Sequence, residues 1–439
     1  MTDLARDHRD APLDAAASAA VAASRLRLHR VGDDDLAQTS AWLEAESRGF
    51  LEGERTEAQR QAFFARGTYR RKLGVYDEAA PHPEMPVATF DSWVAELTVP
   101  GGSAVPACAI SSVTVAPTHR RRGLLRELMS GELRVAAAAG TPVAALTVSE
   151  SSIYGRFGFG PAAHAASWTI APRRAGWIGP DAPGRIDFVS RERGREVVEA
   201  LHERTRRITP GEIAMPGGHW DRYFGTRPDA EDPGKTRVLQ YRSPAGAIDG
   251  LVLYRVTENE HDFADSSLDV SLLLAATDEA YAGLWRFVLS MDLIGTVRAS
   301  QLSVDEPLWW MIADQRAARI EVCDHHYVRI LDVPAALHAR TYEASGTLLL
   351  DVTDPLGFAA GRWLLTVDAD GHGHVTKCEG DAPADAVTVR LGVTELSAAY
   401  LGGVSLATLA RAGRIEASDA DAAAGFFSTV TPPRLSFWY

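Results

Sequence analysis

The sequence predicts a protein of mixed α/β class with about three domains, on the basis of three observations. The chain has 439 residues, and single domains usually contain roughly 100–200 residues. Hydrophobic residues make up 46% and charged residues 23% of the chain, as in ordinary soluble globular proteins. Strand-like and helix-like segments alternate along most of its length, which is typical of α/β and α+β folds.

The first 24 residues are acidic and rich in alanine (MTDLARDHRDAPLDAAASAAVAAS). A secretory signal has a basic start and a strongly apolar middle, and this segment has neither. We expect residues 1–24 to form a disordered tail, with at most a short alanine-rich helix. No stretch approaches the roughly 20 apolar residues that cross a bilayer, so we also expect no membrane span.

The first predicted domain covers residues 25–180. Short apolar runs predict strands, and stretches with a 3.6-residue period predict helices. Residues 171–185 (APRRAGWIGPDAPGR) are rich in proline, glycine and arginine, and they predict a linker or long loop. The predicted strands are 25–29, 87–99, 105–115 and 143–148, and the helical stretches are 39–70 and 120–139.

Two further predicted domains follow, at residues 181–330 and 331–439. The second shows three strand-like runs before a helical segment, and the third opens with a helix, continues through strands and returns to helices. In the second domain the strands are 237–241, 250–256 and 267–275, with a helix at 278–289; in the third the strands are 346–352, 362–367 and 386–391.

The charge and cysteine content exclude several classes of protein. The net charge of −13 argues against general nucleic-acid binding, which needs a basic surface. An acidic surface attracts cationic substrates, or it serves only solubility; charge alone leaves both open. Cys108, Cys323 and Cys378 are far apart and odd in number, so we expect a reducing cytoplasm and neither a disulfide framework nor a metal site.

The turn after the strand at 105–115 carries the strongest chemical signal. Pro117 ends the strand, three arginines and Gly123 follow, and an apolar-periodic helix begins. The first turn of a helix presents unpaired N–H groups and a partial positive charge, and glycine lets phosphates approach the main chain. This combination predicts a pyrophosphate-binding turn. The alternative is a solvated arginine cluster, although cations are unfavourable at a helix N-terminus.

The strand at 143–148 leads into a second motif, SESSIYGRFGFG, at residues 149–160. Ser151 is a suitable cap for a short helix that contains Tyr154. The aromatic and glycine residues then turn the chain into a closing strand at 165–170. From the residues alone, Tyr154 is equally a proton donor and a core aromatic whose hydroxyl reaches the surface.

Together the two motifs resemble the GNAT acetyltransferase superfamily. Arg120 and Gly123 match its R-x-x-G-x-[GA] pattern, whereas Leu125 departs from the small residue usual at that position. The longer strings APTHRRRGLLR and SIYGRFGFGPA resemble the Eis (enhanced intracellular survival) family, and residues 396–415 resemble the end of a sterol carrier protein domain. The resemblance implies two tandem GNAT-like mixed-sheet domains followed by a sterol-carrier-protein-like α/β domain, assembled as a homohexamer.

The resemblance also implies an acetyl-CoA-dependent N-acetyltransferase that needs no metal. The pantetheine would pair with the end of the strand at 105–115, and the pyrophosphate would lie on main-chain N–H groups among the arginines. Residues 149 and 150 would complete the channel. The residues implied to bind acetyl-CoA are Val113, Thr114, Val115, Arg120, Arg121, Arg122, Gly123, Leu124, Leu125, Arg126, Ser149 and Glu150.

Two catalytic residues are implied in the same way. Tyr154 would be the general acid for the leaving thiolate, because a phenol with a pKa of about 10 is protonated at neutral pH. The C-terminal carboxylate of Tyr439 would be the base, although its ordinary pKa of about 3.3–3.7 makes it weak unless burial raises that value. The three terminal aromatic residues, Phe-Trp-Tyr, predict that this end docks into the body of the protein.

The substrate class follows less directly. The acceptor would be a primary amine of a polycationic molecule such as an aminoglycoside, and residues 50–64 would line its pocket. A protein-lysine or polyamine acetyltransferase is the alternative, and a lipid or small-molecule carrier is the second alternative. The second GNAT-like region lacks an arginine–glycine turn, so we predict that it binds no CoA; adjacent His325 and His326 receive no role.

Overall fold

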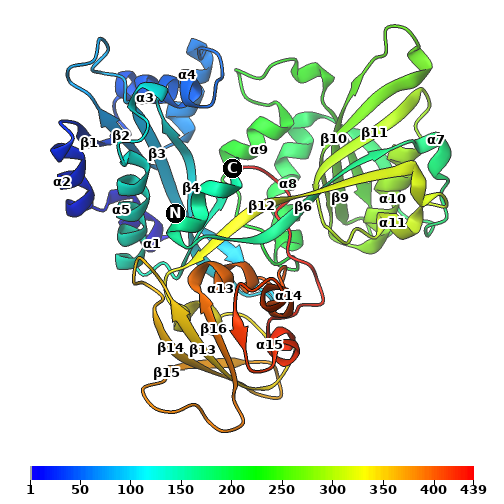
Figure 1. Ribbon diagram of the computed structural model, residues 1–439. Coiled ribbons are helices and arrows are strands. Elements are labelled where there is room, and N and C mark those ends of the chain that lie inside the picture. The colour runs from blue at the N-terminus through cyan, green and yellow to red at the C-terminus, as the bar shows by residue number, and fades with distance from the viewer. Residues whose placement is uncertain (1) are drawn as a thin grey trace. The chain divides into compact units, whose positions relative to one another are not determined.

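The computed structural model describes residues 2–439, which group into two compact units. The first unit holds the chain up to Ala162, His326–Thr429 and the last residue, Tyr439. The second unit holds Ala163–His325 and Val430–Trp438. Each unit is built around a mixed β-sheet with helices packed on it (Figure 1).

The sheet of the first unit has the order β1-β2-β3-β4-β5-β12. Only β4 and β5 are parallel neighbours, and the other pairs are antiparallel. Four of these strands match predicted ranges to within two residues at each end, whereas β2 and β12 were not predicted. The strands are β1 (Arg27–Val31), β2 (Arg71–Tyr76), β3 (Ala88–Thr98), β4 (Ala104–Val115), β5 (Val143–Thr147) and β12 (Ala318–Ile330).

Helices cover this sheet and close two apolar clusters. The larger cluster contains the apolar stripe of α5, the inner faces of β2 to β5 and Tyr154. In the smaller one, Trp42 of α3 stacks on Phe63 of α4, with ring centroids 5.9 Å apart. The predicted helical stretch at 39–70 is therefore two helices. The helices are α3 (Leu36–Gly49), α4 (Glu57–Arg66), α5 (Leu124–Ala138) and α6 (Ser151–Tyr154).

The N-terminal segment differs from the expected disordered tail. It forms α1 (Asp3–Asp10) and α2 (Ala15–Ala23), because side chains of both helices pack against other residues of the first unit. His8 is fully buried with Nε2 2.9 Å from the hydroxyl of Ser92. The small residues of α2 allow close approach to α5, where a Cβ on Gly131 would meet Ala17 at 2.8 Å.

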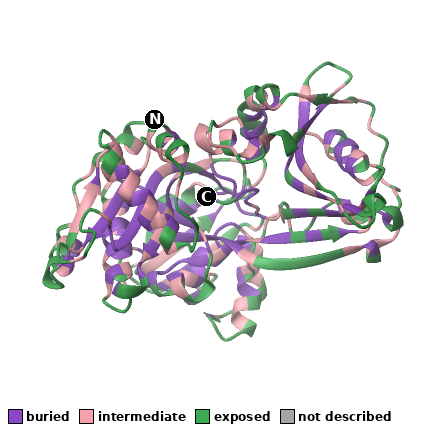
Figure 2. Cartoon of the chain, turned by 90° about the horizontal axis from the view of Figure 1, so that it is seen from above, coloured by how far each residue is buried: buried purple, intermediate pink, exposed green. Residues whose placement is uncertain are grey.

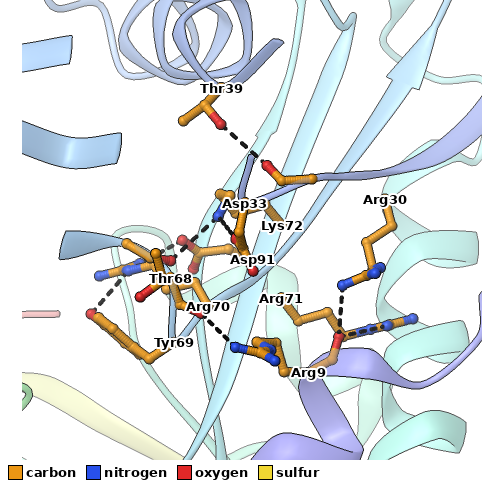
Figure 3. A network of polar contacts seen from close by, with 12 residues as sticks. Arg9, Arg30, Asp33, Thr39, Thr68, Tyr69, Arg70, Arg71, Lys72 and Asp91 are labelled. Carbon is orange, nitrogen blue, oxygen red and sulfur yellow. Dashed lines mark hydrogen bonds and ion pairs between the residues drawn. The ribbon is translucent and has the colours of Figure 1, made fainter. Parts of the chain in front are cut away.

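Strand β2 was missed because it begins with two charged residues. Arg71 and Lys72 are 0% and 2% exposed, and buried charges are stable only when they are paired. Arg71 donates from Nε to Glu132 at 3.0 Å and from its terminal nitrogens to the carbonyls of Arg9 and Pro12, at the end of α1 and in the link to α2. Lys72 pairs with Asp33 at 2.6 Å (Figure 3). Ion pairs with distant parts of the chain thus replace the apolar pattern that marks most buried strands.

The second unit repeats the topology of the first. Its strands follow the order β7-β8-β9-β10-β11-β6, with β10 and β11 as the parallel pair. The predicted loop at 171–185 contains the short helix α7. The strands are β6 (Gly160–Ile170), β7 (Arg185–Val189), β8 (Arg237–Arg242), β9 (Ile248–Thr257), β10 (Ser266–Ala275) and β11 (Ile294–Leu302); the helices are α7 (Pro172–Ala175), α8 (Arg191–Arg206), α9 (Gly217–Phe224), α10 (Asp278–Leu289) and α11 (Leu308–Met311).

The C-terminal domain belongs to the first unit and has its own five-stranded sheet, of order β15-β14-β13-β16-β17. Its helix α13 packs with a buried face rich in small and apolar residues. The strands are β13 (Gly346–Thr353), β14 (Gly361–Val367), β15 (Gly373–Lys377), β16 (Val387–Gly392) and β17 (Glu416–Ala417); the helices are α12 (Val333–His338), α13 (Val393–Ala399), α14 (Leu406–Arg411) and α15 (Ala420–Phe427).

Burial follows this layered architecture. Figure 2 shows the strands and inner helix faces largely buried, while loops and outer helix faces are exposed. Among residues 2–439, no helix combines the length and apolar character that a bilayer crossing requires. All three cysteines are free thiols, and Cys108 is buried in the large apolar cluster.

Candidate active site

Strand β4 separates from β5 part-way along its length. Its pairing with β5 covers Ala107–Ile110 opposite Val143–Leu146, although β4 continues to Val115. On its other side the register with β3 shifts between Thr89 and Asp91, and Ser112 adopts a positive φ of 52°. These features describe a β-bulge, which bends a strand and increases its twist. The bulge leaves the end of β4 with one main-chain edge turned away from β5.

The three residues predicted to pair with pantetheine lie on this diverging end of β4. Thr114 has a buried side chain whose hydroxyl lies 2.7 Å from that of Thr89 on β3. Val113 and Val115 are half-buried and pack against the large apolar cluster. Their side chains are therefore structural, and only the main chain of 113–115 is available to an extended ligand.

The predicted pyrophosphate turn has an open glycine at the start of a helix. Gly123 is the N-cap of α5, has a positive φ of 79° and offers no side-chain cap. A Cβ at Gly123 would meet only the flexible end of Arg126, at 3.5 Å. The first N–H groups of α5 therefore face open space, which is the arrangement that binds phosphate at helix N-termini.

The arginines around this turn are all exposed. Arg121 adopts a positive φ of 64°, which reverses the chain before the helix. Buried His119 holds the start of the turn, because its Nε2 lies 3.1 Å from a carboxylate oxygen of Asp77. Leu124 is buried and Leu125 packs on the apolar cluster, so these two contribute only N–H groups. The exposed arginines of the turn are Arg120, Arg121, Arg122 and Arg126.

The general-acid candidate lies in the short helix that follows β5. Ser149 and Glu150 are exposed, and Glu150 rather than Ser151 occupies the N-cap position of α6. Tyr154 ends the helix with only 7% of its surface exposed, and its ring meets Phe159 edge-on with centroids 6.2 Å apart. Burial, and secondarily the charge of Glu150, raises the pKa of Tyr154 to about 12. Its phenol is thus a proton donor at any physiological pH.

The C-terminal domain holds the chain that leaves this helix. Gly160 touches α13 so closely that a Cβ there would overlap the carbonyl oxygen of Thr394 and lie 2.6 Å from the nitrogen of Ala398. Buried Arg329 donates to the carbonyl of Phe157 at 3.1 Å and pairs with both carboxylate oxygens of Asp354 at 2.7 Å. The glycines of the GFG run are therefore required for close packing.

The last residue, Tyr439, lies against the end of β5, the strand that precedes the helix of Tyr154. The hydroxyl of Thr147 donates to the main-chain oxygen of Tyr439 at 2.7 Å. The phenol oxygen of Tyr439 lies 2.9 Å from Nε2 of His326, which pairs with Thr147 across β12 and β5. The ring of Tyr439 meets Trp93 edge-on at 5.4 Å. Burial raises the pKa of this phenol well above its usual value, so the main-chain oxygen is the functional group to consider.

Docking of the terminal aromatic residues is confirmed for two of the three. Phe437 and Tyr439 are 0% and 7% exposed, whereas Trp438 is 46% exposed. His325 and His326, which received no role from the sequence, each contact this segment. His325 lies with Nε2 3.0 Å from the carbonyl oxygen of Phe437, within the second unit.

A half-buried carboxylate next to the bulge was also missed. Glu46 of α3 accepts a hydrogen bond from the hydroxyl of Ser112 at 3.0 Å. Burial, together with nearby Asp91, raises the pKa of Glu46. The sequence held a signal for this residue, because Glu46 follows Trp42 and Leu43 at helical spacing and so falls on the apolar stripe of its helix.

An arginine–carboxylate pair lies beside Glu46. Arg70 pairs with fully buried Asp91 at 2.5 Å, and its guanidinium lies 4.6 Å from the centre of the Trp93 ring and 5.2 Å from that of Tyr69. Figure 3 shows Tyr69, Arg70 and Asp91 together in this network. Because Arg70 neutralises Asp91, Glu46 is the carboxylate at the bulge with the weaker cationic partner, Arg55, whose guanidinium is 3.9 Å away.

Comparison with known proteins identifies the family. Residues 34–162 and 211–330 match models of an acetyltransferase (GNAT) domain, and residues 333–436 match a sterol carrier protein domain. An uncharacterized N-acetyltransferase of Streptomyces avermitilis is 40% identical over 399 residues, covering 88% of this chain and 92% of the relative. N-acetyltransferase Eis of Mycobacterium tuberculosis is 35% identical over 334 residues, covering 74% and 77%. The chain belongs to the Eis family of N-acetyltransferases.

Solved structures agree with this assignment. Eis1 from Mycobacterium abscessus superposes with a TM-score of 0.79 at 29% identity, covering 94% of this chain and all of that chain (100%). A GCN5-related N-acetyltransferase from Anabaena variabilis shares the fold, with a TM-score of 0.78 at 19% identity. The predicted architecture, two GNAT domains followed by a sterol-carrier-type domain, is therefore confirmed. GNAT acetyltransferases take their acetyl group from acetyl-CoA.

In this Eis-family chain the two GNAT domains differ at the turn where CoA would bind. In the second unit the turn from β10 leads into α10, and Thr277 caps that helix by accepting from the N–H of Ala280 at 3.2 Å. Asp278 and Glu279 follow in the first turn. A capped N-terminus with two carboxylates is unfavourable for a pyrophosphate, and the absence of CoA binding by the second domain stays a prediction.

Proposed function

We propose that this Eis-family enzyme transfers the acetyl group of acetyl-CoA to primary amines of polycationic molecules such as aminoglycosides, by direct attack of the amine on the thioester. The observation that carries the proposal is the divergence of β4 from β5 after Ile110, directly before the open glycine–arginine turn at Gly123. An extended pantetheine needs such a free strand edge, and a pyrophosphate needs such a helix start.

The residues of this turn fit acetyl-CoA. The main-chain edge of 113–115 would hold the pantetheine, and the first N–H groups of α5 would hold the pyrophosphate. Exposed arginines would add charge-assisted hydrogen bonds, and Ser149 and Glu150 would border the channel after β5. Acetyl-CoA supplies the acetyl thioester, and the remaining chemistry belongs to side chains and main-chain groups of this chain.

Two proton transfers are needed, and we assign each to one residue. The amine arrives largely protonated, because amines of the lysine type have a pKa of about 10.4. The carboxylate that Tyr439 carries as the last residue of this chain accepts a proton from the ammonium, and its hydrogen bond from Thr147 fixes its orientation. Tyr154 donates its proton to the sulfur as the thiolate leaves, because its raised pKa keeps the phenol protonated.

A cationic acceptor suits the charges at the bulge. Glu46 is half-buried beside Ser112, with 16% of its side chain exposed, and a partly desolvated carboxylate is stabilised by a nearby cation. The net charge of −13 adds long-range attraction for polycations. We therefore expect Glu46→Gln to raise KM for the amine while leaving KM for acetyl-CoA unchanged. A homohexameric assembly stays a prediction from the family resemblance.

The test is thiol release from acetyl-CoA with an aminoglycoside, a polyamine and a lysine peptide as separate acceptors. The variants are Tyr154→Phe and a chain that lacks Tyr439. Turnover with the aminoglycoside that both variants largely lose supports the substrate class and both catalytic roles. Turnover only with the lysine peptide or the polyamine contradicts the proposed substrate class but keeps the chemistry. No turnover with any amine contradicts the proposal as a whole.

A further inference from the structure

The C-terminal segment Val430–Trp438 is fixed to the second unit by main-chain contacts. The N–H of Arg434 donates to the carbonyl of Pro210 at 2.8 Å, and the N–H of Ser436 donates to a carboxylate oxygen of Glu212 at 3.0 Å. Leu435 is 0% exposed. This is unusual for the end of a chain, because the last residues of most domains fray.

The side chain of Arg434 lies between two buried carboxylates. Its Nε is 3.7 Å from Oε1 of Glu212, and one terminal nitrogen is 3.5 Å from Oε1 of Glu306. The two glutamate side chains are only 4% and 2% exposed. All three line a cavity of about 80 Å³. Arg434 thus supplies positive charge to both carboxylates, and Nε2 of His202 lies 3.8 Å from Glu212 as well.

The carboxylate of Glu306 is itself rigidly placed. It accepts hydrogen bonds from the N–H of Ser303 at 2.7 Å and from the hydroxyl of Tyr281. Burial and the Glu306 charge raise the pKa of Tyr281 well above its usual value, so that this hydroxyl remains a donor. Glu306 is therefore a preformed acceptor for Arg434, and it does not depend on the C-terminal segment for its position.

The main chain on the other side of Arg434 is also shaped for the segment. Gly211 has a φ of +92°, and a Cβ there would meet the carbonyl oxygen and nitrogen of Arg434 at 2.9 and 3.2 Å. Both atoms belong to the backbone and cannot rotate away. A side chain at position 211 would therefore displace the C-terminal segment. It would also be strained by the positive φ of this residue.

We propose that Arg434, held by Glu212 and Glu306, is a positioning residue for acetyl transfer, because it anchors the segment that carries Tyr439. The inference rests on the proposed role of the Tyr439 carboxylate. Only four residues lie between Arg434 and Tyr439, and a chain spans at most about 3.3–3.6 Å per residue. Without this anchor, the contacts of Tyr439 with Thr147, His326 and Trp93 would have to hold the last residue in place.

The charge balance explains why one residue can have this effect. Removing the guanidinium leaves buried Glu306 without Arg434 and leaves Glu212 with only His202, 3.8 Å away, which favours release of the segment and entry of water. A lysine keeps the charge but reaches the two carboxylates as a single point rather than as a planar fork. The methionine variant should therefore lose the anchor, and the lysine variant should keep part of it.

Thiol release with an aminoglycoside acceptor measures the catalytic consequence. Arg434→Met should lower kcat about tenfold or more while KM for acetyl-CoA stays within about twofold, and Arg434→Lys should recover most of the lost rate. The matched control is Arg204→Met, which removes the partner of buried Asp249 (2.7 Å) in the same unit and should keep kcat within about twofold. Equal kcat values for the wild type and Arg434→Met would overturn the proposal.

A combined variant tests whether Arg434 acts through Tyr439. If it does, Arg434→Met in a chain lacking Tyr439 lowers kcat no further than the deletion alone. A multiplicative loss shows that Arg434 acts elsewhere and overturns the proposal. If the deletion alone leaves kcat unchanged, the carboxylate is not the base and the positioning role fails with it.

A readout independent of activity separates the anchor from the proposed function. Carboxypeptidase should release Tyr439 from Arg434→Met at least about tenfold faster than from the wild type or Arg204→Met, since cleavage follows the open population. Should Arg434→Met not fold, Gly211→Ala displaces the same segment and should give the same acceleration. Equal release from all variants refutes the anchor even where thiol release is normal.

Discussion

The hydroxyl of Tyr154 should be separable from its ring, which makes Tyr154→Phe a sharp test of the general acid. Tyr154 is only 7% exposed, and its ring packs edge-on against Phe159. The substitution removes one oxygen and leaves this packing in place. We expect the free energy of unfolding to change by no more than about 1 kcal/mol, the net value of a typical hydrogen bond.

The effect on the rate should be far larger than the effect on stability. A positioned general acid typically accelerates a reaction about 10²–10⁴-fold, which corresponds to about 3–5 kcal/mol of activation free energy. Because the pKa of Tyr154 is raised to about 12, the phenol stays protonated across the neutral and mildly alkaline range. The wild type should therefore show no decline in kcat from loss of this proton below about pH 10.

Thiol release from acetyl-CoA, measured between about pH 6 and 10 beside thermal unfolding, checks both parts. Tyr76→Phe is the matched control, because Tyr76 is a second buried tyrosine of the first unit whose pKa is also raised to about 12 by burial. That control should keep the wild-type rate. A Tyr154→Phe enzyme that keeps kcat within about threefold of the wild type would falsify the acid role, as would a loss of rate no greater than the loss of folded protein.

Three further predictions address the cofactor turn, the GFG contact and the N-terminal helices. Arg120→Ala should raise KM for acetyl-CoA about tenfold with kcat unchanged, since an exposed arginine beside the turn contributes binding only; initial rates at varied acetyl-CoA decide it. Gly160→Ala should lower stability by about 1–3 kcal/mol because its Cβ overlaps the main chain of α13 at Thr394, whereas Gly155→Ala, which meets nothing within 4 Å, should not; equal melting temperatures contradict this. Burial lowers the pKa of His8 to about 4, so below about pH 6.5 the unfolded state binds more protons than the folded state. The free energy of unfolding should therefore fall by about 2 kcal/mol from pH 7.5 to 5. Denaturant unfolding measures this fall, and the variant His8→Gln should not show it.

The sequence predicted the strand–turn–helix at 105–139 well because every signal there is local. Val115 ends β4 and Leu124 begins α5, as Pro117 and Gly123 indicate. The apolar stripe of α5 is strong, and it lies in the core as predicted. Elements whose boundaries and periodicity are both written in neighbouring residues can be read without tertiary information.

The elements that were missed depend on distant partners. Strand β2 opens with Arg71 and Lys72, whose charges are neutralised by Glu132 on α5 and Asp33 before α3. The local sequence of the N-terminal helices resembles a disordered tail, but in the structure His8 is buried beside Ser92. In each case a polar residue is buried because a partner far along the chain satisfies it, and no window of local sequence contains that partner.

The candidate site was predictable in part for the same reason. Its cofactor turn and Tyr154 form contiguous motifs, whereas the surroundings of Tyr439 combine Thr147, His326 and Trp93 from three separate strands. The terminal aromatic run indicated docking but not its destination. Glu46 could have been found, since a charged residue on an apolar helical stripe is a departure that needs an explanation.

The positions of the two proposed catalytic groups also bear on why the chain needs more than its first GNAT domain. Tyr154 belongs to that domain, yet the chain after its helix is held by α13, through Gly160 and Thr394, in the C-terminal domain. Tyr439 is joined to a segment that Arg434 fixes in the second unit. A lipid carrier would require neither contact, because carriage depends on a cavity inside one domain. The proposed acid and base would need such contacts for their placement, since a displacement of about 1 Å in catalytic geometry can cost about a hundredfold in rate.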